Sequence, residues 1–164
     1  MADYFSAYLY LGGRVQREDA PGLVRAVNEQ GFDNVPEFKD VQELCAHVNA
    51  GRPLYQNEAR WGRFEQVQDW LTAHRLPFKI WAEDYGWNPA GIEVYLPGQE
   101  PVYRCSNGDQ EVLVPAHEVI RLSNAILCAS VNGDREELRA RQAELEDLCG
   151  TGDRLTLPPL EVTD

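Results

Sequence analysis

The chain has little positive charge. Its 164 residues include 15 Lys and Arg against 27 Asp and Glu, which gives a formal net charge of -12. A protein that neutralises the phosphates of DNA or RNA needs a basic face, and a protein that docks on an anionic membrane needs one as well. The charge therefore argues against direct binding to nucleic acid and against binding to a membrane surface.

Long apolar runs and paired cysteines are also missing. No stretch approaches the roughly 18 apolar residues of a membrane-spanning helix, and Asp3 stands where a secretion signal would carry a basic residue. The cysteines form neither a CxxC pair nor a zinc-binding spacing. We expect a cytoplasmic protein with reduced thiols, three of them in the core, and with no metal or cofactor. The four cysteines are Cys45, Cys105, Cys128 and Cys149.

Catalytic motifs are scarce. Gly12-Gly13-Arg14 follows a predicted strand but matches neither GxGxxG nor GxxxxGK[ST], so it favours a tight turn over a phosphate site. The three histidines lie far apart in sequence and favour ordinary helix-end positions. A small enzyme would have to bring Glu58, Arg60 and His74 into one pocket. We therefore expect a protein that is not an enzyme.

Apolar material suffices for a packed core, because 43% of the residues are hydrophobic and 10% are aromatic. Apolar periodicity and turn residues divide the chain into short elements. The expected strands are 5–11, 54–59, 78–82, 92–96, 102–105 and 111–114, and the expected helices are 17–30, 38–49, 61–74, 116–131 and 135–149.

This order predicts an α+β fold in a single domain over residues 1–164. Its parts are a split βαβ-like N-terminal portion, an antiparallel β-meander and two C-terminal helices. The tail 155–162 contains Pro158-Pro159 and is expected to be extended. The acidic helix at 134–149 is a candidate appendage to the domain.

A short loop after the predicted strand 78–82 combines acids with aromatics. Glu83, Asp84, Tyr85 and Trp87 stand within five residues of one another. Exposed aromatics are common anchors of protein interfaces, so this loop is a candidate contact with a partner. The alternative is a strand end whose Tyr85 and Trp87 fold back on the core.

Acids are modestly denser in the last 31 residues, which hold nine acids and four Arg for a net charge of -5. One interpretation is a solvated helix face. The other is a negative surface that imitates the phosphates of a nucleic acid or steers the chain onto a basic partner. The candidate partner-binding acids of the last helix are Asp134, Glu136, Glu137, Glu144, Glu146 and Asp147.

Four segments resemble small accessory proteins of bacterial mobile elements and phages. They are residues 10–15 (YLGGRV), 57–65 (NEARWGRFE), 74–78 (HRLPF) and 157–162 (LPPLEV). The resemblance implies a setting in which small acidic inhibitors of host defence are common. It transfers no functional residue to this chain.

Together these observations predict a non-enzymatic acidic inhibitor of the anti-CRISPR or anti-restriction type. Its partner would be a basic protein or ribonucleoprotein complex of the bacterial host, whose nucleic-acid-binding surface it would occupy. The alternative is an immunity protein or antitoxin that neutralises a basic nuclease toxin, which uses the same electrostatics on another partner.

Overall fold

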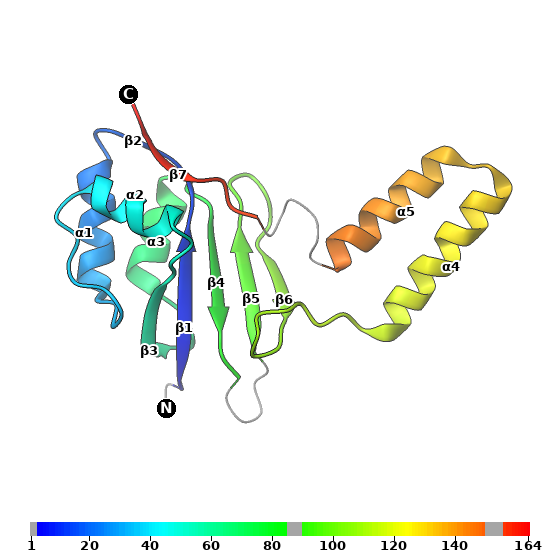
Figure 1. Ribbon diagram of the computed structural model, residues 1–164, viewed down its shortest axis with the longest axis horizontal. Coiled ribbons are helices and arrows are strands. Elements are labelled where there is room, and N and C mark those ends of the chain that lie inside the picture. Colours follow the sequence, from blue (N-terminus) through cyan, green and yellow to red (C-terminus); the bar gives the residue numbers. More distant parts are fainter. Residues whose placement is uncertain (1–2, 85–89, 150–155) are drawn as a thin grey trace.

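A computed structural model describes residues 3–84, 90–149 and 156–164 and shows the α+β fold that the sequence predicts. A five-stranded sheet carries helices on one side, and two further helices form a hairpin that points away from it (Figure 1). The elements are β1 (Tyr4–Leu11), β2 (Gly13–Gln16), α1 (Ala20–Gln30), α2 (Val41–Asn49), β3 (Leu54–Arg60), α3 (Glu65–Ala73), β4 (Phe78–Ala82), β5 (Gly91–Tyr95), β6 (Val102–Cys105), α4 (Ala116–Asn132), α5 (Arg135–Leu148) and β7 (Leu160–Thr163).

The sheet has the strand order β3-β1-β4-β5-β6, and all its pairs are antiparallel. Because β1 lies between β3 and β4 and is antiparallel to both, β3 and β4 run in the same direction and are joined by α3. This is the split βαβ unit that the sequence predicts. Strands β4, β5 and β6 form an antiparallel meander, in which β5 and β6 correspond to the first two strands of the meander predicted at 92–96, 102–105 and 111–114.

The main core lies between α1, α2 and α3 and one face of the sheet. Along β1, alternate residues such as Ala7 and Leu9 are fully buried, which is the period of a strand with one face on a core. Leu23 of α1, Leu44 of α2 and Leu71 of α3 are buried in the same cluster. This cluster contains no residue of α4 or α5.

The other face of the sheet carries a smaller apolar cluster around Trp81 and Ile92. The connection between β6 and α4 packs on this face, because Val112 joins the cluster and Trp81 Nε1 donates a hydrogen bond to Ser106 Oγ at 2.9 Å. Tyr10 also donates its hydroxyl hydrogen to Gln110 Oε1 at 2.7 Å. The segment predicted as a strand at 111–114 forms only an isolated bridge, from Val112 to Ser106.

The last described segment returns to the domain. β7 pairs in parallel with β2, and the Asn49 side chain exchanges two hydrogen bonds with the backbone of Leu160, at 2.8 and 2.9 Å. A Cβ at Gly12 would collide with the carbonyl oxygen of Pro158, so glycine lets this segment cross the β1–β2 bend. The α4–α5 hairpin is therefore inserted in the chain between two strands, β6 and β7, that both belong to the domain.

Two predictions about individual residues are wrong. Trp61, predicted as the first core position of a helix, is 48% exposed, because it and Gly62 have positive φ angles of 56° and 64° and form a turn before α3 begins at Glu65. Three cysteines are predicted in the core, but only Cys45 packs against it, half-buried, whereas Cys105 and Cys128 are exposed and Cys149 is half-buried. Apolar residues next to a cysteine in the sequence indicate a helix or strand, but they do not show whether the cysteine lies on the buried face of that element.

Candidate interaction surface

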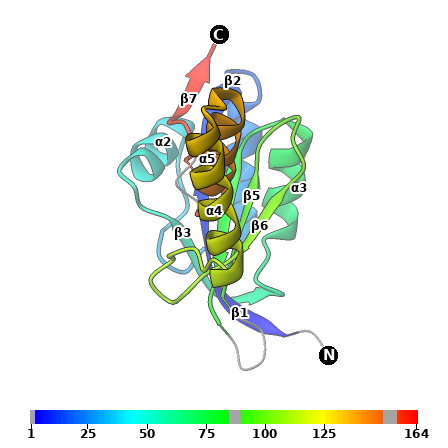
Figure 2. The ribbon, with the colours of Figure 1, turned by 90° about the vertical axis from the view of Figure 1, so that its right-hand side faces the viewer.

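Helices α4 and α5 form an antiparallel hairpin whose turn is encoded locally. Gly133 ends α4 in the left-handed conformation, with φ 71° and ψ 16°, where glycine has little steric cost. Asp134 then caps α5, because its side chain accepts a hydrogen bond from the Glu137 backbone N–H at 3.0 Å. Figure 1 shows the hairpin standing off the sheet, and in the perpendicular view of Figure 2 its two helices lie in front of the sheet.

The hairpin has almost no core of its own. In α4 only Leu122 and Ala129 are buried, and in α5 no residue is. Short isolated helices are marginal in water, and most helices in proteins owe their stability to packing on an apolar face. The two helices therefore depend on each other and leave surface for a further partner. None of the helices in the described ranges is both long and apolar enough to cross a membrane.

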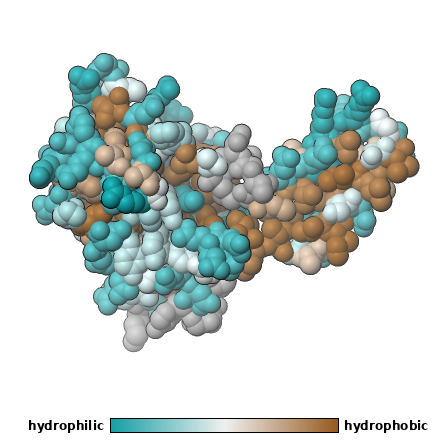
Figure 3. Space-filling model, viewed as in Figure 1, coloured by the Kyte–Doolittle hydropathy of each residue, from teal (hydrophilic) through white to brown (hydrophobic). Residues whose placement is uncertain are grey.

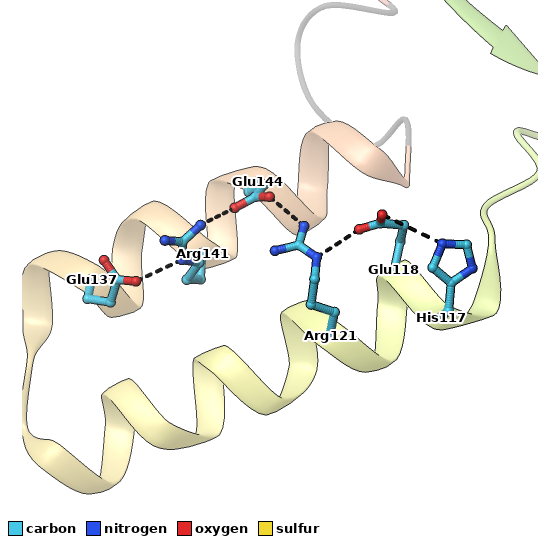
Figure 4. Close-up of polar contacts among 6 residues, drawn as sticks. All are labelled: His117, Glu118, Arg121, Glu137, Arg141 and Glu144. Carbon is cyan, nitrogen blue, oxygen red and sulfur yellow. Dashed lines mark hydrogen bonds and ion pairs between the residues drawn. The ribbon is translucent and has the colours of Figure 1, made fainter.

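Charged side chains connect the two helices (Figure 4). Glu144 of α5 accepts a hydrogen bond from Arg121 of α4 at 2.8 Å and another from Arg141 at 2.6 Å. Arg121 also binds Glu118 at 2.9 Å, and Arg141 binds Glu137 at 2.8 Å. These five residues form one chain of alternating charges along the side of the hairpin.

The Arg121 guanidinium, and after it that of Arg141, lowers the pKa of Glu144 below its ordinary value of 4.5, because their hydrogen bonds favour the ionised carboxylate. A lowered carboxyl pKa stabilises the folded hairpin above pH 4.5, and this contribution is lost as the pH falls through the folded-state pKa. We expect the helicities of the wild-type chain and of Glu144→Gln to differ near about pH 6, and this difference to disappear as the pH falls through the lowered pKa of Glu144, below 4.5. Far-UV circular dichroism measures this, and a difference that persists in acid would contradict it.

The predicted acidic surface of the last helix is divided among several roles. Besides Glu137 and Glu144 in the ion-pair chain, Asp147 binds Arg104 of β6 at 3.2 Å and Asp134 is the helix cap. Glu136 and Glu146 are exposed. Arg135 and Arg139 are exposed on the same helix, so the outside of α5 carries both signs of charge.

The predicted contact loop lies only partly in the described residues. Glu83 is half-buried at the end of β4, where its backbone N–H donates to Ser6 O at 2.9 Å. Burial, and then the charge of Glu83, raise the pKa of Tyr8 beside it. Asp84 is exposed, and Tyr85 and Trp87 lie outside the described residues.

A feature that the sequence reasoning missed lies on the outside of α4. Ile120, Leu127 and Val131 are 61%, 62% and 78% exposed. Among the described residues, the exposed large aliphatic side chains are these three and Leu113, just before the helix. At about 100° per residue, the three side chains point in nearly one direction, opposite to buried Leu122 and Ala129. Figure 3 shows apolar residues along the hairpin and hydrophilic ones along its α5 edge.

The sequence contains a signal for this surface. Residues 122–133 form the longest stretch without Asp, Glu, Lys or Arg, although 26% of the chain is charged. The next longest, residues 4–13, contains the central strand β1, whose burial explains its neutrality. Residues 122–133 are neutral yet mostly exposed. We call the face formed by Ile120, Leu127 and Val131 the α4 stripe.

The side chains considered for catalysis are not assembled into a site. Glu58 and Arg60 are exposed on β3, where Arg60 pairs with Tyr4 at the start of β1. His74 directly follows α3, which leads to the other end of β1. The His74 ring stacks on the Trp70 ring, with 3.8 Å between the ring centroids. Its Nε2 lies 3.7 Å from Asp19. His74 is thus a helix-end histidine, as its sequence position indicates.

A cavity of about 410 Å³ beside the sheet is lined by Lys79 and Arg52. Burial lowers the pKa of Lys79, whose ammonium lies 4.3 Å from the centroid of the Tyr10 ring. Two cations in one cavity can hold an anionic group. The described lining adds no carboxylate, imidazole or thiol that could serve as a base or nucleophile beside Lys79.

Among the described residues, no group of three or more His, Cys, Asp or Glu side chains could hold a metal ion. Comparisons with protein-family models, with curated proteins and with solved structures find no match for this chain. The resemblance to accessory proteins of mobile elements therefore stays a prediction from sequence.

Proposed function

We propose that the chain is a non-enzymatic protein-binding protein and that the α4–α5 hairpin makes the contact. The observation that carries this proposal is the α4 stripe: Ile120, Leu127 and Val131 are more than 60% exposed on one face of a helix that stands off the domain. Contiguous exposed apolar residues are typical of interaction sites. A hairpin with only two buried residues also gains stability when a partner covers it.

The biological role that we propose for this binding protein is based on its sequence. In the first proposal the chain inhibits bacterial defence by occupying a basic surface of a host protein, and in the alternative it is an immunity protein or antitoxin. Both would use Glu136 and Glu146, which are exposed on α5. Glu137 and Glu144 bond arginines of the hairpin, so a charge-reversal test should leave these two in place.

Photo-crosslinking in bacterial cells tests the proposal. A photoreactive amino acid is placed at Leu127 on the α4 stripe, at Glu136 on α5, or at the exposed Tyr103 of β6 as a control. We expect the photoreactive residue at position 127 to give crosslinked adducts, which mass spectrometry identifies. We expect none of the same proteins to be crosslinked from position 103. Because all three side chains are exposed, the fold should tolerate each replacement.

The crosslinked positions distinguish the versions. Adducts with a basic host protein from position 136 alone, weakened by Glu136→Lys with Glu146→Lys, would move the contact from the α4 stripe to the acidic side of α5. No adduct from either hairpin position would contradict a binding role for the hairpin.

A further inference from the structure

The spacing of the α4 stripe is that of a helix-pairing seam. From Ile120 the exposed positions on this face follow at steps of four, three and four residues: Asn124, Leu127 and Val131. Alternating steps of three and four are the a/d pattern with which one helix packs against another. The inner positions of α4, including Leu122 and Ala129, form a separate pattern that faces α5. Helix α4 therefore has two packing faces, and α5 occupies one.

A polar residue that lies on the same face as the α4 stripe, Asn124, indicates what kind of partner covers it. Asn124 stands at a position of the seam that apolar residues otherwise occupy. A buried asparagine at such a position is satisfied by an asparagine on the opposing helix, because the amide both donates and accepts hydrogen bonds. Such residues fix the register and the number of helices at a cost in stability. A second α4 supplies this partner from the same sequence.

The charge distribution favours the same occupant. Two copies of a protein with a net charge of -12 repel each other over most of their surfaces. Residues 122–133 carry no charge, and Arg121 at the edge of the stripe is paired with Glu118 and Glu144. Two copies can meet at this face without placing like charges opposite each other, whereas a basic partner would find no carboxylate within 122–133.

We propose that a second copy of this chain covers the α4 stripe, so that two α4–α5 hairpins form a four-helix bundle. This inference rests on the proposed binding role of the hairpin and names its occupant. The symmetric contact places the same residues on both sides, as in most homodimers. In such a bundle the α5 helices stay on the outside, so Glu136 and Glu146 of each copy remain accessible.

The contact is small. Helix α4 has 17 residues and is about 25 Å long, so its one face offers less than the roughly 800 Å² per partner of a standard interface. We therefore expect a dimer with a Kd in the micromolar range, on the order of 1 to 100 µM.

Sedimentation equilibrium of the full chain, from about 1 to 500 µM, tests the proposal. The average mass should rise from 18.6 kDa toward twice that value. Leu127→Arg should raise the Kd at least about tenfold, because it places a charge in the seam of both copies. Gln142→Arg, which adds the same charge at an exposed position of α5, should leave the Kd unchanged. Circular dichroism below the Kd should show equal helicity in both variants, since both positions are exposed.

Asn124→Val gives a readout specific to the seam. Removal of the polar residue should tighten association about tenfold or more and populate species larger than a dimer. A chain that stays monomeric at about 500 µM, or an association that Leu127→Arg leaves unchanged, would overturn the proposal. In either case, adducts between position 127 and another protein in cells would keep the binding role of the hairpin and remove only the second copy as its occupant.

Discussion

A chain in which a short Gly-Ser linker replaces residues 115–149 should fold, and it should lose self-association. The expectation follows from the location of the core. Both apolar clusters of the domain are built from the sheet, α1, α2, α3 and their connections, and neither contains a residue of α4 or α5. The strands on either side of the deletion are held independently, β6 by β5 and β7 by β2.

Urea denaturation gives the quantitative form of this prediction. The free energy of unfolding of the shortened chain should lie within about 1 kcal/mol of the full chain's at a dilution where the full chain is monomeric. The deletion removes the Arg104–Asp147 ion pair between β6 and α5, and partly exposed pairs contribute little to stability. A shortened chain that fails to fold would show that the hairpin is part of the domain's core.

Phe64→Ala should lower the free energy of unfolding by about 3–5 kcal/mol. Phe64 is 0% exposed just before α3, and its ring centroid lies 5.2 Å from that of Phe32. Truncation removes the buried ring and leaves a cavity between α3 and the loop after α1. A loss of this size is a large fraction of the roughly 5–15 kcal/mol that stabilise an ordinary domain.

Trp61→Ala is the matched control, because it truncates a larger aromatic three residues away. Trp61 is 48% exposed in the turn before α3, so we expect a loss below about 1 kcal/mol. Denaturant midpoints of the two variants, compared with the wild type at equal slopes, measure both effects. Equal losses at the two positions would contradict the placement of the helix start at Glu65.

The sequence predicts much of the domain because its signals are local. Periodicity, Gly31 and Gly51 after two helices, and Pro77 after a third indicate the element order, and a strand-helix-strand segment next to an earlier strand indicates the split βαβ unit. The pairing of β7 with β2 could not be predicted, since it joins residues nearly 150 positions apart. Trp61 was misplaced because apolar spacing ignores the positive φ angles of Trp61 and Gly62.

The acids of the hairpin show a second limit of prediction from sequence. Counting charges along the sequence finds an acidic helix, but it cannot show that Arg121 of α4 lies against Glu144 of α5 or that Arg104 of β6 reaches Asp147. Three-dimensional contact turns part of a net charge into internal ion pairs. The α4 stripe, in contrast, can be recognised in the sequence. It is a second set of apolar residues at helical spacing, on a helix that contains the uncharged segment 122–133.

The central claim is that the hairpin exposes a binding surface which a partner buries. Amide hydrogen exchange as a function of protein concentration tests this claim. At about 1 µM the amides of α4 should exchange much faster than those of β1, and toward about 500 µM the exchange of α4 should slow while that of β1 stays constant. Exchange in α4 that is as slow as in β1 at the lowest concentration, and independent of concentration, would contradict the claim.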